Sequence, residues 1–358
     1  SLIIYLIHQL KINFILRVRV LFWFLLLFMC LCGSSFAFLV LNWEQNKIEG
    51  VITVKIPKGI TLKEITGILS EKNIVKSDRS FMLAVRSLGY EKDIQAGNLI
   101  LHEPKTNFRL IHQLVNGMPE LVKITVLEGW NIYKVAETLE NTLGIHQNKV
   151  ISLCMNKRFI RNMEIKAPTL EGFLFPETYY FVESESPRII LRKMVSEYKD
   201  HISDDMRNRI TELGFSELQL ITLASIIEGE AIYDEERKNI SSVYHNRLHK
   251  GMRLQADPTI QYIIKDGPRR LLNKDLNIES PYNTYLNEGL PIGPINSPGL
   301  KSIIAALYPA ESEYIYFVAK GDGYHTFSRT QKEHNFAKRK LNSLRKKVSR
   351  ERLLRKKR

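Results

Sequence analysis

Cysteine is scarce in this 358-residue sequence, and the motifs of metal and nucleotide sites are missing. Of its three cysteines, Cys30 and Cys32 lie in an apolar N-terminal run, so Cys154 is alone in whatever lies beyond that run. A disulfide or a cysteine metal site is thereby excluded there, and Cys154 is expected to be a small core residue. The nine histidines show no HExxH or comparable ligand spacing, and there is no GxGxxG or P-loop. The sequence therefore predicts no metal and no cofactor.

Positive charge is plentiful but gathers at one end. The formal net charge is +14, yet residues 338–358 hold twelve Lys and Arg against one acid, Glu351. The other 337 residues carry 40 basic and 37 acidic side chains and are close to neutral. A basic tail of this kind is more often a solvated or surface-adsorbing extension than a reader of bases. Because no nucleic-acid motif accompanies the tail, we expect no nucleic-acid partner.

A long uncharged run stands near the N-terminus. Val20–Leu41 is 22 residues without a charged side chain, enough to span the hydrocarbon core of a bilayer. Lys11, Arg17 and Arg19 precede it, and positive flanks stay in the cytoplasm. This predicts a cytoplasmic segment 1–19, a single transmembrane helix, and a chain that faces outward beyond it. The alternative is a cleaved signal peptide; we favour a retained anchor because the run is longer than a usual signal-peptide core.

A repeated pattern follows the apolar run. Residues 51–75, VITVKIPKGITLKEITGILSEKNIV, align with residues 121–145, LVKITVLEGWNIYKVAETLENTLGI, at an offset of 70. Each copy reads as an alternating strand, a glycine turn and an amphipathic helix. We interpret residues 42–150 as a small α+β domain with a βα repeat that resembles LysM domains. Its role stays open between glycan binding and a structural spacer.

Residues 151–337 are predicted to form a second, mostly helical domain, so the fold class of the chain is α+β. Strands at Tyr314–Ala319 and Tyr324–Phe327 flank a KGDG turn, which is a strong hairpin signal. Ahead of the helices, Leu170–Phe181 (LEGFLFPETYYF) mixes aromatic residues with two glutamates. If exposed, this segment would line a carbohydrate groove; if buried, it would be core plus a turn.

The chain is organised around the helix predicted to begin at Ser216, SELQLITLASIIEGE. Ser216 and Gln219 form a capping-box pattern, and the residues that follow are apolar nearly all round, which indicates a buried helix. The helix nevertheless ends on Glu228 and Glu230. Burial and the negative end of the helix dipole favour the protonated form of such a glutamate, as a general acid requires. Glu228 is therefore the candidate catalytic acid; the alternative is that it pairs with an arginine or caps a backbone amide.

Other residues of this helix have different expected roles. Residues two apart on a helix point about 200° apart, so Glu230 faces away from a cleft that Glu228 faces, unless the helix breaks at Gly229. Thr222 and Ser225 lie toward the Glu228 side, where either hydroxyl is placed to bind the carboxyl or a sugar.

Several motifs, in order, resemble those of the MltG/YceG-like endolytic murein transglycosylases. They are LASIIEGEA (223–231), VYHNRLHKGMRLQADPTIQY (243–262), SPYNTYLNEGLPIGPINSPG (280–299) and YFVAKGDGYHTFSRT (316–330). LEGFLFPETYYF resembles the family's segment ahead of the catalytic region, and the anchor and the LysM-like domain also agree. The resemblance covers about Val51 to Lys340, and the basic tail falls outside it.

The resemblance implies a lyase of the bacterial cell wall, anchored in the inner membrane with its catalytic domain, 151–337, outside the cytoplasm. Such an enzyme cleaves the bond between N-acetylmuramic acid and N-acetylglucosamine within peptidoglycan strands and leaves a 1,6-anhydromuramic acid end. It is expected to terminate the elongation of nascent strands. The implied partners are peptidoglycan glycan strands, the membrane and peptidoglycan synthases.

Carried over residue by residue, the family's catalytic acid falls on Glu228. Gln255 and Tyr282-Asn283 resemble the glutamine and Tyr-Asn motifs of Slt-type transglycosylases and are expected, with Ser225, to hold the sugar. From the residues alone, Gln255 also reads as a tie between two loops, and Asn283 as a residue that satisfies the backbone of its own turn. A transglycosylase needs only one carboxyl, because the substrate's own 6-hydroxyl replaces water or an enzymic nucleophile.

Two other classes of protein remain open. A glycan hydrolase would pair Glu228 with a second carboxylate, Asp257 or Glu171, across one cleft. A catalytically inert peptidoglycan-binding scaffold would bind glycan through the repeat domain and leave Glu228 exposed or locked in a salt bridge away from any groove.

Overall fold

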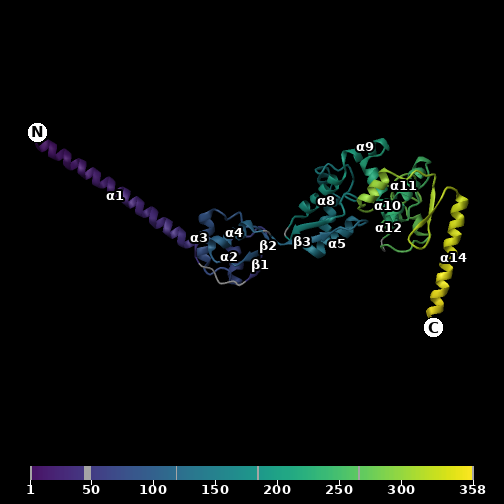
Figure 1. The fold of residues 1–358 in the computed structure, drawn as a ribbon, viewed down its shortest axis with the longest axis horizontal. Helices are drawn as coiled ribbons and strands as arrows, with labels where there is room; N and C mark the ends of the chain where they lie inside the picture. The colour runs from purple at the N-terminus through teal and green to yellow at the C-terminus, as the bar shows by residue number, and fades with distance from the viewer. Residues whose placement is uncertain (1, 44–49, 118, 184, 265–266, 357–358) are drawn as a thin grey trace. The chain divides into compact units, whose positions relative to one another are not determined.

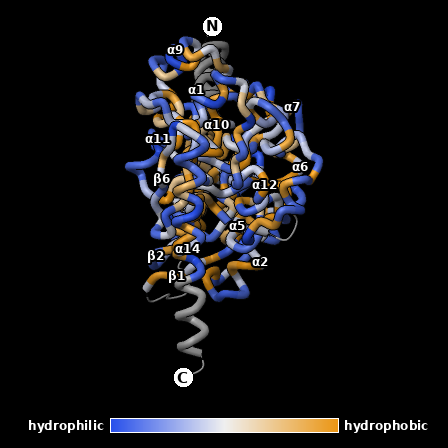
Figure 2. Tube along the Cα trace, turned by 90° about the vertical axis from the view of Figure 1, so that its right-hand side faces the viewer, coloured by the Kyte–Doolittle hydropathy of each residue, from blue (hydrophilic) through white to orange (hydrophobic). Residues whose placement is uncertain are grey.

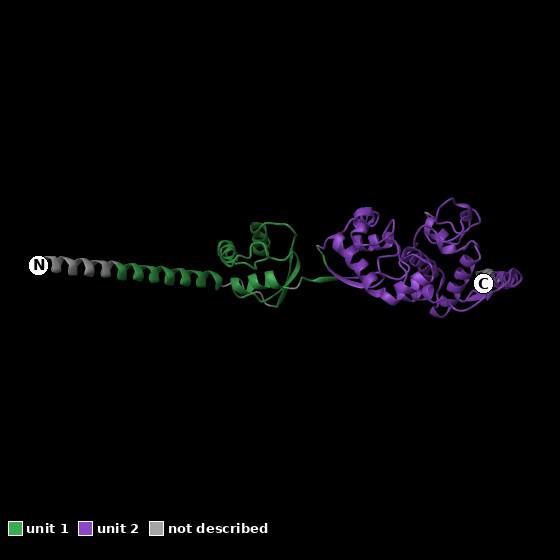
Figure 3. Cartoon of the chain, turned by 90° about the horizontal axis from the view of Figure 1, so that it is seen from above, with its two compact units in different colours: residues 1–122, 182–184 green, residues 123–181, 185–358 purple. Residues whose placement is uncertain are grey.

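The computed structural model divides the chain into two compact units, residues 1–122 with 182–184, and residues 123–181 with 185–358 (Figure 3). It describes residues 2–43, 50–117, 119–183, 185–264 and 267–356. Residues 44–49 of the predicted LysM-like domain and the last two residues of the predicted basic tail lie outside the described residues. The domain boundary predicted at residue 150 falls inside the second unit, and its placement stays a prediction.

The first unit begins with α1 (Leu2–Leu41) (Figure 1). Its stretch Arg19–Leu41 is long and apolar enough to cross a membrane, with a mean hydropathy of 2.5. Most large apolar side chains of this stretch are exposed, as expected for a surface that lipid covers. The C-terminal end of α1 is attached to the rest of the unit, because Val40 is buried and its carbonyl accepts a 2.8 Å hydrogen bond from Asn107 Nδ2.

The core of the first unit combines a two-stranded sheet with three helices. The strands pair antiparallel, from Val51 opposite His102 to Ile56 opposite Gly97. The alternation in VITVKI buries Val54 and Ile56, which is the period-2 pattern of a half-buried strand. The elements are β1 (Val51–Ile56), α2 (Leu62–Glu71), α3 (Asp78–Leu88), β2 (Gly97–His102) and α4 (Asn107–Asn116).

The second copy of the repeat opens the second unit, and its strand pairs with the end of the aromatic segment. Within LEGFLFPETYYF, the aromatic side chains are buried except Tyr180, which is 58% exposed. This segment is therefore core, the second of the two alternatives that the sequence left open. The elements here are β3 (Leu121–Thr125), α5 (Ile132–Leu143), α6 (Gln147–Cys154), α7 (Lys157–Arg161) and β4 (Thr178–Val182), with β3 beside β4.

Helices dominate the remainder of the second unit, around α10 (Glu217–Glu230). α10 begins at the predicted capping box of Ser216 and Gln219, and residues 220–227 are all buried, in keeping with their hydropathy (Figure 2). A helix whose side chains are buried on every face must have other elements packed against every face. Its neighbours include α9, α11, α12 and α13. The helices around it are α8 (Pro187–His201), α9 (Asp204–Glu212), α11 (Asp234–His249), α12 (Asp257–Ile263) and α13 (Leu300–Leu307).

The C-terminal elements are β5 (Tyr316–Ala319), β6 (His325–Ser328) and α14 (Gln331–Lys356). β5 and β6 pair antiparallel, with Tyr316 opposite Ser328. The basic segment that begins at residue 338 continues α14, and Ala337 and Leu341 are buried. The basic residues therefore begin on a helix that packs on this hairpin.

Candidate active site

Glu228 lies in the last turn of α10 and is almost enclosed, with a side chain that is 7% exposed. Oε1 is 3.2 Å from Nη1 of Arg237 on α11, and Oε2 accepts a 3.0 Å hydrogen bond from the backbone N–H of Gly299. Arg237 also donates to Asp234 Oδ1 at 3.0 Å and to Ser302 Oγ. A cation and an N–H donor both stabilise negative charge. Glu228 therefore makes the two contacts, with an arginine and with a backbone amide, that the alternative to a catalytic acid described.

A loop of seven residues, 293–299 (GPINSPG), runs along the C-terminal half of α10 and ends on Glu228. Ser225 holds this loop, because its Oγ accepts a 3.1 Å bond from Ile295 N and its carbonyl accepts a 2.9 Å bond from Asn296 Nδ2. Ser225 is fully buried, and its hydroxyl donates to Thr222 O at 2.8 Å. In this structure Ser225 therefore anchors the loop that reaches Glu228; its contact with sugar stays a prediction.

The glycine turn of the second repeat copy lies on the other side of this loop. Gly129 N donates to Ser297 O at 2.9 Å, and Ser297 N donates to Trp130 O at 2.7 Å. A side chain at Gly129 would place its Cβ 3.9 Å from Cγ of Glu228. The turn thus forms one wall of the Glu228 site.

The same turn contains Glu128, whose carboxyl lies beside Gly299, the glycine whose N–H donates to Glu228. A Cβ at Gly299 would lie 1.9 Å from Oε1 of Glu128. The φ angle of Gly299 is −71°, so glycine is needed there for space and not for backbone conformation. Burial raises the pKa of Glu128, the charge of Glu228 raises it further, and the charges of Arg237 and Lys301 oppose the rise. Two electrostatically coupled carboxyls therefore share the start of α13.

Glu230 faces a different environment. α10 continues through Gly229, where a Cβ would be only 2.7 Å from Cβ of Pro258. Glu230 Oε1 accepts a 3.1 Å hydrogen bond from the buried Tyr244 hydroxyl, and burial raises the pKa of Glu230 to about 7. Its partners differ from those of Glu228, and the prediction that Glu230 faces away from a cleft stays a prediction.

Gln255 is hydrogen-bonded to Thr284, the residue that follows Asn283. Gln255 is exposed and has a left-handed backbone, φ 48°, while its N–H donates to Thr284 O at 3.0 Å. A non-glycine residue in this conformation is strained, and such strain gathers at binding sites. Asn283 is fully buried and satisfies backbone groups of its own turn, the carbonyls of Leu276 and Ile278 and the N–H of Tyr285. Gln255 is therefore open to a ligand, whereas Asn283 shapes the loop.

Tyr282 lies at the far end of the loop 293–299. A Cβ at Gly293 would be 3.4 Å from its hydroxyl, and its ring centroid is 5.0 Å from that of Tyr262. The Tyr262 hydroxyl in turn donates to Glu171 Oε2 at 3.1 Å. Tyr282 is half-buried, which leaves part of its ring open.

The two carboxylates considered for a hydrolase have other partners. Glu171 is 1% exposed and accepts a 3.2 Å bond from Ile132 N at the start of α5, and burial raises its pKa to about 8. Asp257 accepts a 2.5 Å hydrogen bond from the Tyr285 hydroxyl. In the described part of the chain, Glu128 lies beside Glu228, in the place that the hydrolase alternative would give to one of these two.

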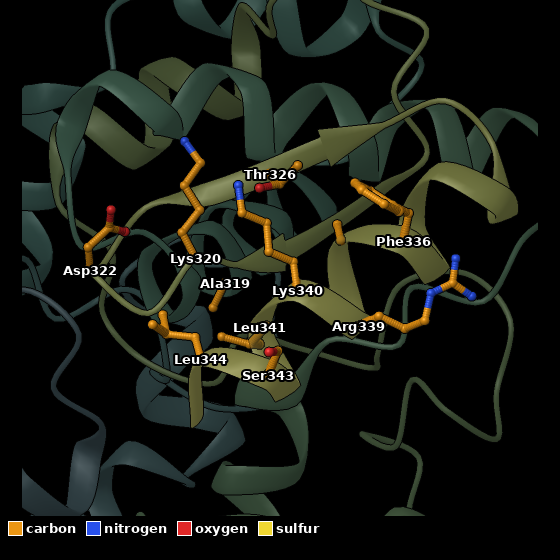
Figure 4. A pocket seen from close by; sticks show the side chains of 11 residues that line it. Ala319, Lys320, Asp322, Thr326, Phe336, Arg339, Lys340, Leu341, Ser343 and Leu344 are labelled. Atoms are coloured by element: carbon orange, nitrogen blue, oxygen red, sulfur yellow. The ribbon is translucent and has the colours of Figure 1, made fainter. Parts of the chain in front are cut away.

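A cavity of about 840 Å³ lies elsewhere, between the β5–β6 hairpin and α14 (Figure 4). Its walls combine apolar side chains, such as Phe336 and Leu344, with the cations Lys320 and Lys340. The residues that line it do not include those around Glu228. The coupled carboxyls at the end of α10 therefore lie outside this cavity.

Sequence reasoning missed Glu128, Arg237 and Gly299. A signal for Glu128 exists in the repeat, because Lys58 occupies the matching position of the first copy. A residue that differs in charge between two otherwise similar turns marks a difference in their surroundings. No local pattern distinguishes Arg237, which reaches Glu228 from another helix.

The fold and the site define a class of protein: a mixed helix-and-sheet chain with an apolar N-terminal helix and a glutamate site suited to acid–base chemistry. In the ranges that the structure describes, no cluster of three or more His, Cys, Asp or Glu is arranged to hold a metal ion. The chain belongs to the YceG-like family, which residues 54–340 match.

Two curated relatives and one solved structure extend this match. The chain is 34% identical over 313 residues to the endolytic murein transglycosylase of Bacillus subtilis, covering 83% of this chain and 86% of that protein. It is 29% identical over 316 residues to the protein of the same name in Streptococcus pneumoniae, of whose length it spans 57%. A crystal structure of a YceG-like protein from Listeria monocytogenes is 32% identical, with a TM-score of 0.56, and the match covers 80% of this chain and 99% of that one.

Proposed function

We propose that this chain is a membrane-anchored endolytic peptidoglycan transglycosylase with Glu228 as an acid–base residue. The relatives in Bacillus subtilis and Streptococcus pneumoniae carry that activity in their names. The family match includes every residue of the cluster around Glu228. The observation that carries the proposal is the enclosed carboxyl of Glu228, held between Arg237 and Gly299 at the end of an apolar helix.

The proposed reaction consumes no water. The bond between the anomeric carbon of N-acetylmuramic acid and the 4-oxygen of N-acetylglucosamine breaks, and the muramic 6-oxygen bonds to that carbon. The leaving 4-oxygen gains a proton and the 6-hydroxyl loses one, so the product ends in 1,6-anhydromuramic acid. Positioned carboxyls that move such protons contribute about 10²- to 10⁴-fold to rate.

The stretch Arg19–Leu41 supports a membrane anchor. In this proposal the N-terminus is cytoplasmic, the second unit works outside the cytoplasm, and cleavage within a nascent strand terminates its elongation beside peptidoglycan synthases. The exposed Gln255 and the half-buried Tyr282 would hold sugar, and the buried Ser225 and Asn283 would support the loops that present them.

The test is mass spectrometry of the fragments that the full-length chain, in detergent, releases from purified peptidoglycan. Internal fragments with 1,6-anhydromuramic acid ends are expected. Glu228→Gln keeps the shape of the side chain and removes its titrating proton, so we expect a loss of about 10³-fold. Glu230→Gln, the same change two residues along the helix, is the matched control and should stay within a few fold of wild type. Undiminished cleavage by Glu228→Gln would refute its assignment.

The coupled carboxyls favour a second candidate, hydrolysis, because most glycosidases use two carboxyls about 5 to 9.5 Å apart. Cleavage in ¹⁸O-labelled water separates the candidates: reducing muramic ends that carry the label mean hydrolysis, and unlabelled anhydro ends mean transglycosylation. A salt bridge from Glu228 to Arg237 that lies away from any groove would fit an inert scaffold, and glycan binding without any cleavage would support that class.

A further inference from the structure

We propose that Glu128 is a second catalytic residue of this chain, the proton donor to the leaving sugar, while Glu228 is the base. The inference rests on the proposed function and deepens it. In the single-carboxyl scheme, one residue first donates a proton to the leaving oxygen and then accepts the proton of the 6-hydroxyl. Here each of the two carboxyls performs one of these transfers.

The first argument is position. Oε2 of Glu228 lies 3.0 Å from the Gly299 nitrogen, and Oε1 of Glu128 lies 1.9 Å from where a Gly299 Cβ would stand. Since that nitrogen and that Cβ are separated by about 2.5 Å, the two carboxyl oxygens are no more than about 7.5 Å apart. Carboxyls at this separation act on one glycosidic bond in other enzymes.

The second argument is access. The side chain of Glu228 is only 7% exposed, and both of its oxygens already have donors. Glu128 is exposed and stands on a glycine turn that two backbone hydrogen bonds to Ser297 hold in place. Glu128 is therefore the carboxyl of this pair that a sugar meets first.

The third argument is charge. Arg237 and the Gly299 N–H both donate to Glu228, and such donors stabilise negative charge, so the proposal takes Glu228 as the charged member of the pair. A second negative charge beside it is unfavourable, and like-charged neighbours in one site tend to hold a proton between them. The other charged groups that face Glu128 are Asp234, which opposes its ionisation, and Lys301 and Arg237, which favour it. Burial and then the charge of Glu228 raise the pKa of Glu128, so the proposal takes Glu128 as the carboxyl that carries the proton.

The step balances without a co-reactant. Protonated Glu128 gives its proton to the 4-oxygen as the glycosidic bond breaks, and Glu228 takes the proton of the muramic 6-hydroxyl as the new bond forms. One proton has then moved from Glu128 to Glu228. Its return between two carboxyls that share Gly299, directly or through water, restores the starting state.

The first experiment measures kcat/KM on peptidoglycan strands against pH for the full-length chain and Glu128→Gln. We expect a loss of at least about 100-fold. Wild type should show a bell-shaped profile, whose basic limb reports the loss of the donor proton. In Glu128→Gln the residual activity should lose that basic limb. Lys58→Gln, at the matching position of the first repeat copy, is the control and should leave rate and profile unchanged.

A second substrate separates proton donation from a structural role. A dinitrophenyl glycoside of the N-acetylglucosamine–N-acetylmuramic acid disaccharide has a leaving group that needs no proton. Glu128→Gln should cleave it within about tenfold of the wild-type rate while losing at least about 100-fold on strands. Equal losses on both substrates would mean that Glu128 only shapes the site and would overturn the proposal. Wild-type activity of Glu128→Gln on strands at every pH would also overturn it.

Gly299→Ala tests the same residue from the other side. Its backbone suits alanine, so the new Cβ should displace the Glu128 side chain and leave the Glu228 bond to the residue 299 N–H in place. We expect at least about a tenfold loss, and the double variant with Glu128→Gln should lose no more than Glu128→Gln alone. Additive losses would contradict the proposal. If wild type itself cleaves no peptidoglycan, the proposed function fails; if wild type cleaves and only these results differ, the role of Glu128 fails alone.

Discussion

The two copies of the βα repeat fold alike but have different neighbours. Residues 51–60 and 121–130 show the same sequence of buried, half-buried and exposed positions, residue for residue. Both turns use a left-handed glycine, Gly59 with φ 81° and Gly129 with φ 78°. The helices bury matching faces, Leu62, Ile65 and Leu69 in one and Ile132, Val135 and Leu139 in the other. Alternation, a glycine and a helical stripe are enough to make this unit twice.

One difference between the copies is the set of residues that their turns contact. Around Gly59 an added Cβ would find no atom within 4 Å, whereas at Gly129 it would meet Glu228. The residue before the glycine is Lys58 in the first copy and Glu128 in the second. One copy therefore presents its turn to solvent, and the other places a carboxyl beside a buried one. The second copy therefore contributes to the Glu228 site through its turn, although its own fold is the same as that of the first copy.

The starts of the two helices differ in the same way. α2 begins with a capping box in which the exposed Glu64 accepts from the Thr61 N–H at 2.7 Å. α5 begins beside the fully buried Glu171, which accepts from Ile132 N. Hydrogen bonds from Thr61 lower the pKa of Glu64, whereas burial raises that of Glu171 to about 8.

The largest effect that should separate the copies is the pH dependence of stability. Because the pKa of Glu171 is higher folded than unfolded, its neutral form is favoured in the fold. Its contribution is complete below the unfolded value of about 4.3 and is lost as pH rises toward 8. The free energy of unfolding should fall by up to about 1.4 kcal/mol per pH unit in that window. Urea denaturation at pH 5 and pH 8 should show this fall in wild type and a flatter profile in Glu171→Gln.

Glu64→Gln is the control for this prediction. The pKa of Glu64 is lowered in the fold, so its contribution is present above the unfolded value and is lost only as pH falls below it. Its removal should leave the profile between pH 5 and pH 8 parallel to that of wild type. A Glu171→Gln profile parallel to wild type in this window would show that burial at Glu171 does not hold its proton.

A smaller effect should separate function from stability at the two turns. Gly59→Ala and Gly129→Ala each force alanine into a left-handed backbone, at a cost of about 1 to 2 kcal/mol. The two losses of stability should be alike. Cleavage of peptidoglycan should fall about tenfold in Gly129→Ala, since the strained turn carries Glu128 and backs onto Glu228. It should be unchanged in Gly59→Ala. Equal activity of the two variants, measured on folded protein, would mean that the second turn is no wall of the site.

Much of this arrangement was predictable from local pattern. The capping box of Ser216 and Gln219 and the all-round burial of α10 follow from residues within one helix, and the structure has both. The buried position of Cys154 also follows from its type. These features depend on spacing along a single element, which sequence displays directly.

The electrostatic setting of Glu228 was not predictable in the same way. The sequence indicates burial and the helix dipole at Glu228, but it does not display the contacts with Arg237 and the Gly299 N–H. These partners come from two other elements, and Glu128 comes from a hundred residues upstream. Pairing across such separations depends on how helices pack, so only the contrast with Lys58 within the repeat hinted at it.

The smallest predicted effect concerns the caps that begin α2 and α5. Thr61 Oγ1 accepts from Glu64 N at 3.4 Å, and Asn131 Oδ1 accepts from Lys134 N at 2.9 Å. Thr61→Ala and Asn131→Ala each remove one acceptor from a helix N-terminus, so each should cost about 1 kcal/mol of stability. Thermal unfolding should register two similar decreases, and cleavage by the folded fraction should match wild type in both. A loss of activity in Asn131→Ala alone would extend the functional difference between the copies from the turn into the first turn of α5.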